Sequence, residues 1–188
     1  MAPEVPWQFT WANLSIPSIN LNGAISQYTP EQLVGTVVYD SNGNQVSGGA
    51  VVPAEPGTIA WYTGIPDGIL SATASQCVVL YGHSYLNGGA IFDNLPNMTA
   101  DSTATISTGN GETLNYSFVD SFKIAKGSLA SDPRLSVEVP GCLILITCHR
   151  DGDRDADGHA IENTVVRLQL VVPKPAKPLS KWAMDHLL

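Results

Sequence analysis

The sequence is poor in charged residues, and the charge that it carries is mostly negative. Of 188 residues, 14% are charged, and 9 Lys and Arg stand against 17 Asp and Glu, so the formal net charge is −8. Nucleic-acid binding needs a basic face to meet the phosphates, and no cluster of Lys and Arg supplies one. The composition therefore argues against nucleic acid as a partner.

Cysteine and long apolar runs are scarce as well. Three cysteines do not make a disulfide scaffold, and an odd number leaves at least one thiol unpaired within the chain. No apolar run is long enough to cross a bilayer, and no signal peptide is recognisable. What remains, with 44% hydrophobic residues, 17 Gly and 13 Pro, is typical of one folded, loop-rich domain.

Short runs rich in Val, Ile and Thr recur between turn signals, which predicts an all-β domain. We place it at residues 12–172, between an extended N-terminal arm (1–11) and a C-terminal arm (173–188). Pro17 predicts an edge strand or two short strands with a break. We predict short helices at 29–34 and 91–95, a turn at 41–44, and a hairpin that joins 102–108 to 113–124.

Three apolar strands each end near, or carry, one chemically competent residue. The run 143–147 is apolar on both faces and leads into Cys148; the run 76–81 leads into Gly82 and His83; the run 163–172 contains Arg167. Cysteine in an apolar strand is more often inert packing than a nucleophile. A thiol at the end of a rigid strand, with a histidine and an arginine available, has what a reactive thiolate needs.

These residues and their neighbours resemble the sortases, the cysteine transpeptidases of Gram-positive cell surfaces. The segment Leu145-Ile146-Thr147-Cys148 fits the family's L-x-T-C signature, with Ile144 where many members have Thr. Gly82-His83, the following 89–95 segment (GAIFDNL), and the earlier 57–62 segment (GTIAWY) are similar to family motifs in the same order. The contexts look most like the actinobacterial classes E and F.

The resemblance implies a closed, mainly antiparallel, eight-stranded β-barrel with short helices in the connections. It implies cleavage of an LPxTG-like sorting signal through a thioacyl intermediate on Cys148, and transfer to an amine of peptidoglycan or of a pilin. The enzyme would work at the extracellular face of a Gram-positive membrane, with membrane contact only through an anchor that this chain does not contain. Thr147, Tyr85 and Trp61 are candidates for the substrate groove, with core packing as the alternative for Trp61.

The chemistry assigns each residue of the expected triad a role. His83 is the natural acid for the leaving amine, because histidine exchanges its proton near neutral pH. Arg167 would stabilise the oxyanion with its fixed fork of donors, so Arg167→Lys is predicted to cost on the order of 10²-fold in activity. Arg150 is the rival arginine, an ion pair with the acidic loop is the alternative for Arg167, and His149 should point to the opposite side from Cys148.

The acidic run 151–162 partly matches a calcium loop, although neither register is complete. Its candidate ligands are Asp153, Asp155, Asp157 and Glu162, and a solvated acidic loop is the alternative interpretation. No other cofactor is expected.

The two remaining cysteines share a spacing. Cys77 precedes His83 by the same number of residues as Cys142 precedes Cys148. In the family, the strands that end at the histidine and the cysteine run side by side in parallel, so Cys77 and Cys142 should be neighbours. Two reduced thiols are expected in preference to a disulfide, because side chains on adjacent parallel strands rarely meet its geometry.

Two other functions stay open. One is a different cysteine enzyme such as an L,D-transpeptidase, although its Ser-His-Gly-Cys motif is absent from the sequence. The other is a non-catalytic β-domain that binds calcium or a cell-wall ligand.

Overall fold

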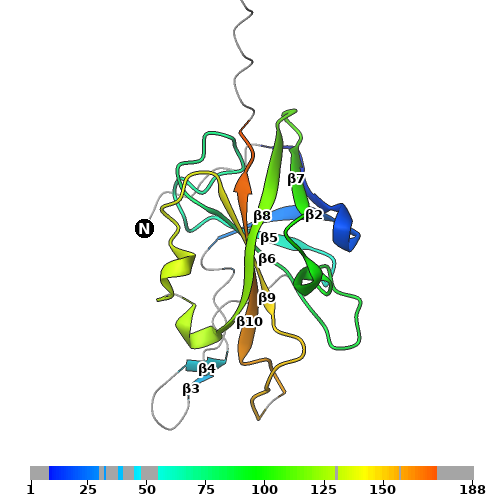
Figure 1. The fold of residues 1–188 in the computed structure, drawn as a ribbon, viewed down its shortest axis with the longest axis vertical. Coiled ribbons are helices and arrows are strands. Elements are labelled where there is room, and N and C mark those ends of the chain that lie inside the picture. Colours follow the sequence, from blue (N-terminus) through cyan, green and yellow to red (C-terminus); the bar gives the residue numbers. More distant parts are fainter. Residues whose placement is uncertain are drawn as a thin grey trace, which may run out of the picture.

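The structure is a computed structural model, and it describes residues 9–29, 32, 38–39, 45–47, 55–129, 131–156 and 158–172. Within these residues eight strands close into one barrel, and a further pair of short strands forms a separate hairpin beside it (Figure 1). The barrel strands are β1 Ala12–Ile16, β2 Leu21–Tyr28, β5 Ile59–Tyr62, β6 Val78–Tyr81, β7 Thr103–Thr108, β8 Thr113–Ala125, β9 Cys142–Cys148 and β10 Glu162–Leu170. The hairpin is β3 Val38–Tyr39 with β4 Gln45–Ser47, and the short 3-10 helices are η1 Pro17–Ile19, η2 Leu95–Asn97, η3 Lys126–Ser128 and η4 Pro133–Leu135.

The barrel closes in the order β1-β2-β5-β6-β9-β10-β8-β7. Only β2 with β5 and β6 with β9 pair in parallel, and the other neighbours in the barrel are antiparallel. Closure leaves no unpaired strand edge in the barrel, which removes the usual route to edge-to-edge association. The predicted closed, mainly antiparallel eight-stranded barrel is confirmed.

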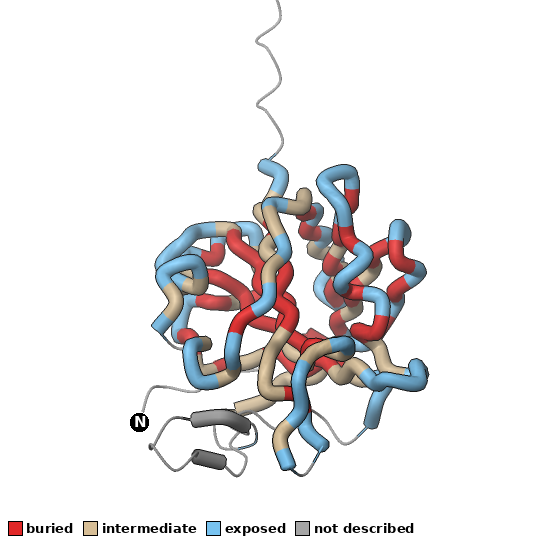
Figure 2. Tube along the Cα trace, turned by 60° about the horizontal axis from the view of Figure 1, so that its bottom comes forward, coloured by how far each residue is buried: buried red, intermediate tan, exposed pale blue. Residues whose placement is uncertain are grey.

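Strand β9 lies between β6 and β10 and is buried on both faces. Leu143 and Leu145 point into the barrel core, whereas Ile144 and Ile146 belong to a second apolar cluster on the outer face. A two-sided apolar environment explains why the sequence here is a continuous apolar run rather than an alternating one. Figure 2 shows buried positions gathered in the interior of the barrel, with exposed positions mainly on the outer connections.

The connection between β8 and β9 covers the second cluster. Residues Leu129, Leu135 and Val137 from this connection pack against the outer face of the barrel. The Cys77 amide donates to the Val137 carbonyl at 2.8 Å, which ties the connection to the start of β6. The connection between β8 and β9 therefore forms a wall over the face of β6 and β9 that leads toward Cys148.

Several local predictions can be compared with the fold. The break at Pro17 is confirmed: β1 and β2 are separated by η1, and Asn20 adopts the left-handed conformation with φ 54°. Since the barrel is closed, neither strand is an edge. The hairpin of 102–108 with 113–124 is also confirmed, as β7 and β8.

The predicted helix at 91–95 is wrong. This segment is a turn that leads into η2, because Phe92 and Asp93 are used to brace the loop that precedes them. Most of the predicted helix at 29–34, the turn at 41–44 and the C-terminal arm from 173 lie outside the described residues. No helix among the described residues is long and apolar enough to span a membrane.

Candidate active site

Cys148 is the last residue of β9 and the first along that strand to leave the core. Every preceding residue of β9 is buried, whereas Cys148 is partly exposed, and its thiol is free. Pairing with Asn163 of β10 fixes its backbone, and β6 pairs with the residues of β9 that precede it. The predicted combination of a rigid support and solvent access is therefore present.

His83 lies level with Cys148 on the neighbouring strand. The parallel register pairs Val79 with Ile144 and Tyr81 with Ile146, and two further residues along each chain bring His83 opposite Cys148. The ladder continues past β6, since the Gly82 amide donates to the Ile146 carbonyl at 3.2 Å. Neighbouring strands are about 4.8 Å apart, so this register, continued by one residue beyond Gly82, brings His83 beside Cys148.

The loop that carries His83 is braced by the segment after it. A Cβ on Gly82 would lie 2.6 Å from the ring of Phe92, so the fully buried Phe92 accepts only glycine beside it. The Asp93 carboxylate accepts hydrogen bonds from the amides of Tyr85 and Ala90, both at 2.7 Å. These contacts give the GAIFDNL motif a physical role, which is to hold the histidine loop in place.

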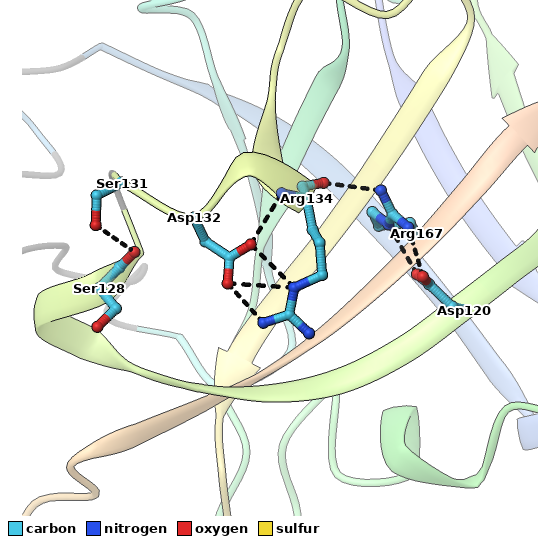
Figure 3. Close-up of polar contacts among 6 residues, drawn as sticks. All are labelled: Asp120, Ser128, Ser131, Asp132, Arg134 and Arg167. Carbon is cyan, nitrogen blue, oxygen red and sulfur yellow. Dashed lines mark hydrogen bonds and ion pairs between the residues drawn. The ribbon is translucent and has the colours of Figure 1, made fainter.

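Arg167 is not brought to this pair. It lies opposite Ile144, four residues before Cys148 on β9. Its guanidinium forms a two-point ion pair with Asp120 and donates to the Arg134 carbonyl at 2.9 Å (Figure 3). The hydrogen bond to Asp120 raises the pKa of Arg167, and the guanidinium is directed at β8 and the wall.

The wall has an ion pair of its own beside this one. Asp132 accepts from the Arg134 amide and side chain, and this hydrogen bonding lowers the pKa of Asp132 to about 2 (Figure 3). The Arg134 guanidinium also stacks 3.8 Å over the ring of Phe122. Together with Arg167, these contacts fasten the wall to strands β8 and β10.

The two residues after Cys148 diverge. His149 is buried on the opposite face, as predicted, with Nδ1 3.0 Å from Thr164 Oγ1, and burial lowers the pKa of its imidazole. Arg150 lies in the turn that follows, and its Nε is 3.6 Å from the Asp151 carboxylate. Of these two side chains, only Arg150 is partly exposed.

An apolar groove of about 500 Å³ runs along the outer face of β6 and β9 under the wall. Val79, Tyr81, Ile144 and Ile146 form its floor, on the two strands that lead to His83 and Cys148. Burial raises the pKa of Tyr81 to about 12, so its hydroxyl is neutral there. The groove therefore offers an uncharged floor on the strands that support the candidate catalytic pair.

Two of the predicted groove residues lie elsewhere. Trp61 is 1% exposed in the barrel core, and its indole Nε1 donates to the Gly68 carbonyl at 3.0 Å. Thr147 is buried, and its hydroxyl donates to the Gly82 carbonyl at 2.8 Å, which links the two catalytic strands. Strand alternation turns both side chains away from the groove. The groove prediction for Thr147 is therefore wrong, and for Trp61 the core-packing interpretation is confirmed. Tyr85 is exposed, with its ring 5.2 Å from that of His83, and it remains a candidate.

The acidic loop does not gather its carboxylates among the described residues. The Asp155 carboxylate caps the amide of His159 at 2.8 Å, and Arg154 donates to the carbonyls of Arg150 and Gly158. Asp157 lies outside the described residues. No group of three or more metal-binding side chains is found in the part of the chain that the structure describes, and calcium binding stays a prediction.

Cys77 and Cys142 are neighbours, which confirms the predicted strand alignment. The register that pairs Val78 with Leu143 sets them side by side, and both are buried and free. Cys77 lies 3.5 Å from the Ser136 carbonyl oxygen under the wall. A hydrogen bond between the two thiols, and then burial, raise the pKa of Cys142.

We expect only Cys148 to react with a thiol reagent in the folded protein, because the other two thiols are buried. Titration with a chromogenic disulfide should give one fast equivalent when folded and three when unfolded in denaturant without reductant. One equivalent in the unfolded chain would instead demonstrate a bridge between Cys77 and Cys142. Mass spectrometry of the labelled peptide would identify the residue.

Sequence reasoning missed one residue beside the thiol. Asn163, at the start of β10, lies directly opposite Cys148. Tyr62, Ile65 and the connection after η3 complete the lining of the groove. Alternation along β10 put Asn163 on the same face as Arg167. The register between β9 and β10 decides which of the two lies opposite the thiol, and it cannot be read from the sequence.

Comparisons with known proteins agree with this geometry. A family model described as the sortase domain matches residues 14–171. Sortase C-1 from Actinomyces oris has a similar fold, with a TM-score of 0.58 and 21% identity over 86% of this chain and 73% of the other. A lid mutant of sortase A from Corynebacterium diphtheriae gives 0.52 and 22% over 89% and 73%, and sortase A from Listeria monocytogenes gives 0.56 and 11% over 93% of both chains.

No curated protein sequence matches the chain significantly. At these low identities the similarity to solved structures supports the fold. The family model, which spans most of the sequence, supports the family assignment. The barrel, the level cysteine and histidine, and the family match lead to one conclusion: this chain belongs to the sortase family of cysteine transpeptidases.

Proposed function

We propose that this chain cleaves an LPxTG-like sorting signal through a thioacyl intermediate on Cys148 and transfers the acyl group to an amine. The observation that carries the proposal is the parallel register of β6 and β9, which keeps the two chains level as they lead into His83 and Cys148 and forms the floor of the apolar groove. The amine would come from peptidoglycan or a pilin, and the site of action would be the cell surface.

The groove fits an extended, mostly apolar peptide. Two pairs of opposite side chains, Val79 with Ile144 and Tyr81 with Ile146, form its floor. Leu135 and Val137 face this floor from the wall. An extended peptide rises about 3.3 Å per residue, so residues on the acyl side of the scissile bond would lie over these pairs. A leucine and a proline have the apolar surface that such a floor buries favourably.

The catalytic step assigns one role to each partner. The Cys148 thiolate attacks the carbonyl carbon, and the carbonyl π electrons move to oxygen. When the oxyanion collapses, the C–N bond breaks, its electron pair remains on nitrogen, and His83 gives this amine a proton. An incoming amine then attacks the thioester, loses its proton to His83, and releases Cys148.

The test uses fluorogenic LPxTG and LAxTG peptides, with a peptide of scrambled sequence as the control. We expect cleavage of at least one sorting-signal peptide, faster product formation when triglycine or a lysine amine is added, and a mass increase on Cys148 that corresponds to the acyl fragment. Cleavage of the scrambled peptide at the same rate, or no cleavage of either signal, would contradict the proposed substrate class.

A further inference from the structure

We propose that the side-chain amide of Asn163, rather than the Arg167 guanidinium, donates the hydrogen bond that stabilises the oxyanion during acyl transfer on Cys148. This inference rests on the proposed function only in that Cys148 takes part in acyl transfer. It assigns a catalytic role to a residue that the sequence comparison does not single out.

The register of β9 and β10 places Asn163 closest to the thiol. The two strands are antiparallel, and Asn163 lies directly opposite Cys148. Backbone hydrogen bonds join His149 to Glu162 and Leu170 to Gly141, both at 2.8 Å, so the ladder bonds fall on the odd-numbered residues of β9. Cys148 and Asn163 therefore form a non-hydrogen-bonded pair, the kind in which Cα atoms are only about 4.5 Å apart and side chains are closest.

Both side chains lie on the groove face of the sheet. Opposite residues of an antiparallel pair share a face, and Val165 and Ile146, on the next rung, both pack in the outer cluster. Val166 points the other way, into the barrel core. Asn163 thus stands on the same side as the groove floor, at the edge where a scissile carbonyl would lie against Cys148.

The amide of Asn163 is available, whereas the other polar groups on this face of β10 are engaged. Arg167 is bound to Asp120 and to the wall, and the Gln169 amide donates to the Pro140 carbonyl at 3.0 Å. No hydrogen-bond partner is found for the half-buried Asn163 side chain among the described residues. A partly desolvated donor without a partner is suited to a charge that appears only in the transition state.

Distance argues against Arg167. From Ile144, its partner on β9, to Cys148 is four residues, or about 13 Å along the strand. Reaching the thiol would also break the ion pair with Asp120. Arg150 is nearer along the chain, but it lies in the turn beside Asp151 and is not held on the groove face by strand pairing.

The experiment compares two reactions of Cys148 that differ in one respect. Acylation by p-nitrophenyl acetate passes through a tetrahedral oxyanion and requires no sorting signal, whereas alkylation by iodoacetamide forms no oxyanion. We expect Asn163→Ala to lower the acylation rate on the order of 10²-fold while the alkylation rate stays within about threefold of wild type. Asn163→Asp, which keeps the shape but lacks the donor, should lose acylation as well and guards against misfolding of the first variant.

Matched controls come from the same face of the same strand. Gln169→Ala removes an amide at the far end of β10, and Arg167→Lys tests the guanidinium. Both should acylate within about threefold of wild type. The proposal is overturned if Asn163→Ala acylates normally, if alkylation falls in parallel with acylation, or if the loss appears in Arg167→Lys or Arg150→Lys instead. Failure to cleave LPxTG-like peptides with normal Asn163-dependent acylation would remove the proposed substrate and leave this inference standing.

Discussion

Cys148→Ala should abolish peptide turnover, because no other group in the site can form the thioacyl bond. The loss should be complete within the sensitivity of the fluorogenic assay, and the acyl-enzyme mass should disappear. Since Cys148 is partly exposed at the end of β9, its replacement should change the free energy of unfolding by no more than about 0.5 kcal/mol. Denaturant unfolding of both proteins measures this.

The protein contains its own control for this substitution. Cys142→Ala removes a buried thiol from the same face of the same strand, and it should lower stability by on the order of 1 kcal/mol while turnover persists. Residual turnover in Cys148→Ala would contradict the nucleophile. A large loss of stability without loss of activity would show that Cys148 serves packing instead.

His83→Asn should lower turnover by on the order of 10²- to 10⁴-fold, the usual contribution of a positioned general acid. The reason is that the departing amine must take a proton, and the parallel register of β6 and β9 leads His83 toward Cys148. A peptide ester, whose leaving group needs less help from an acid, should lose less than the corresponding amide. Parallel measurement of kcat on the two substrates separates proton donation from a general loss of structure.

Two other histidines serve as controls. His159 is exposed on the acidic loop, and His159→Asn should behave as wild type. His149 is adjacent to Cys148 in sequence but is buried on the other face against Thr164. If His149→Asn folded and reproduced the ester-to-amide difference while His83→Asn did not, the assignment of the acid would be wrong.

Local patterns in the sequence predicted much of the fold and one part of the site. The continuous apolar run before Cys148 indicated a strand buried on both faces, and β9 is one. The resemblance to the sortases implied that the strands ending at His83 and Cys148 run in parallel, and the equal offsets of Cys77 and Cys142 then placed these two residues side by side, which the structure confirms. Such inferences succeed because burial and pairing leave a direct trace in residue order.

The distance between Arg167 and Cys148 could not be predicted from the sequence. Alternation along β10 gave the face of Arg167 correctly, but the distance to Cys148 depends on how many residues the acidic loop consumes before pairing begins. That loop delays pairing until Glu162. Asn163 therefore lies opposite Cys148, and Arg167 lies opposite Ile144, four residues before the thiol. For Trp61 the sequence left a groove position and core packing both open, because a short apolar strand does not reveal which of its faces is the interior.

The parallel ladder between β6 and β9 also constrains how the enzyme becomes active. His83 and Cys148 are far apart in the chain, and between them lie the hairpin of β7 and β8 and the wall over the groove. Pairing over such a sequence distance is slow to form, because the loop-closure entropy is lost before any contact compensates for it. The thiol and its acid therefore meet only when the barrel closes, so catalytic competence should appear late in refolding and be missing from partly folded chains.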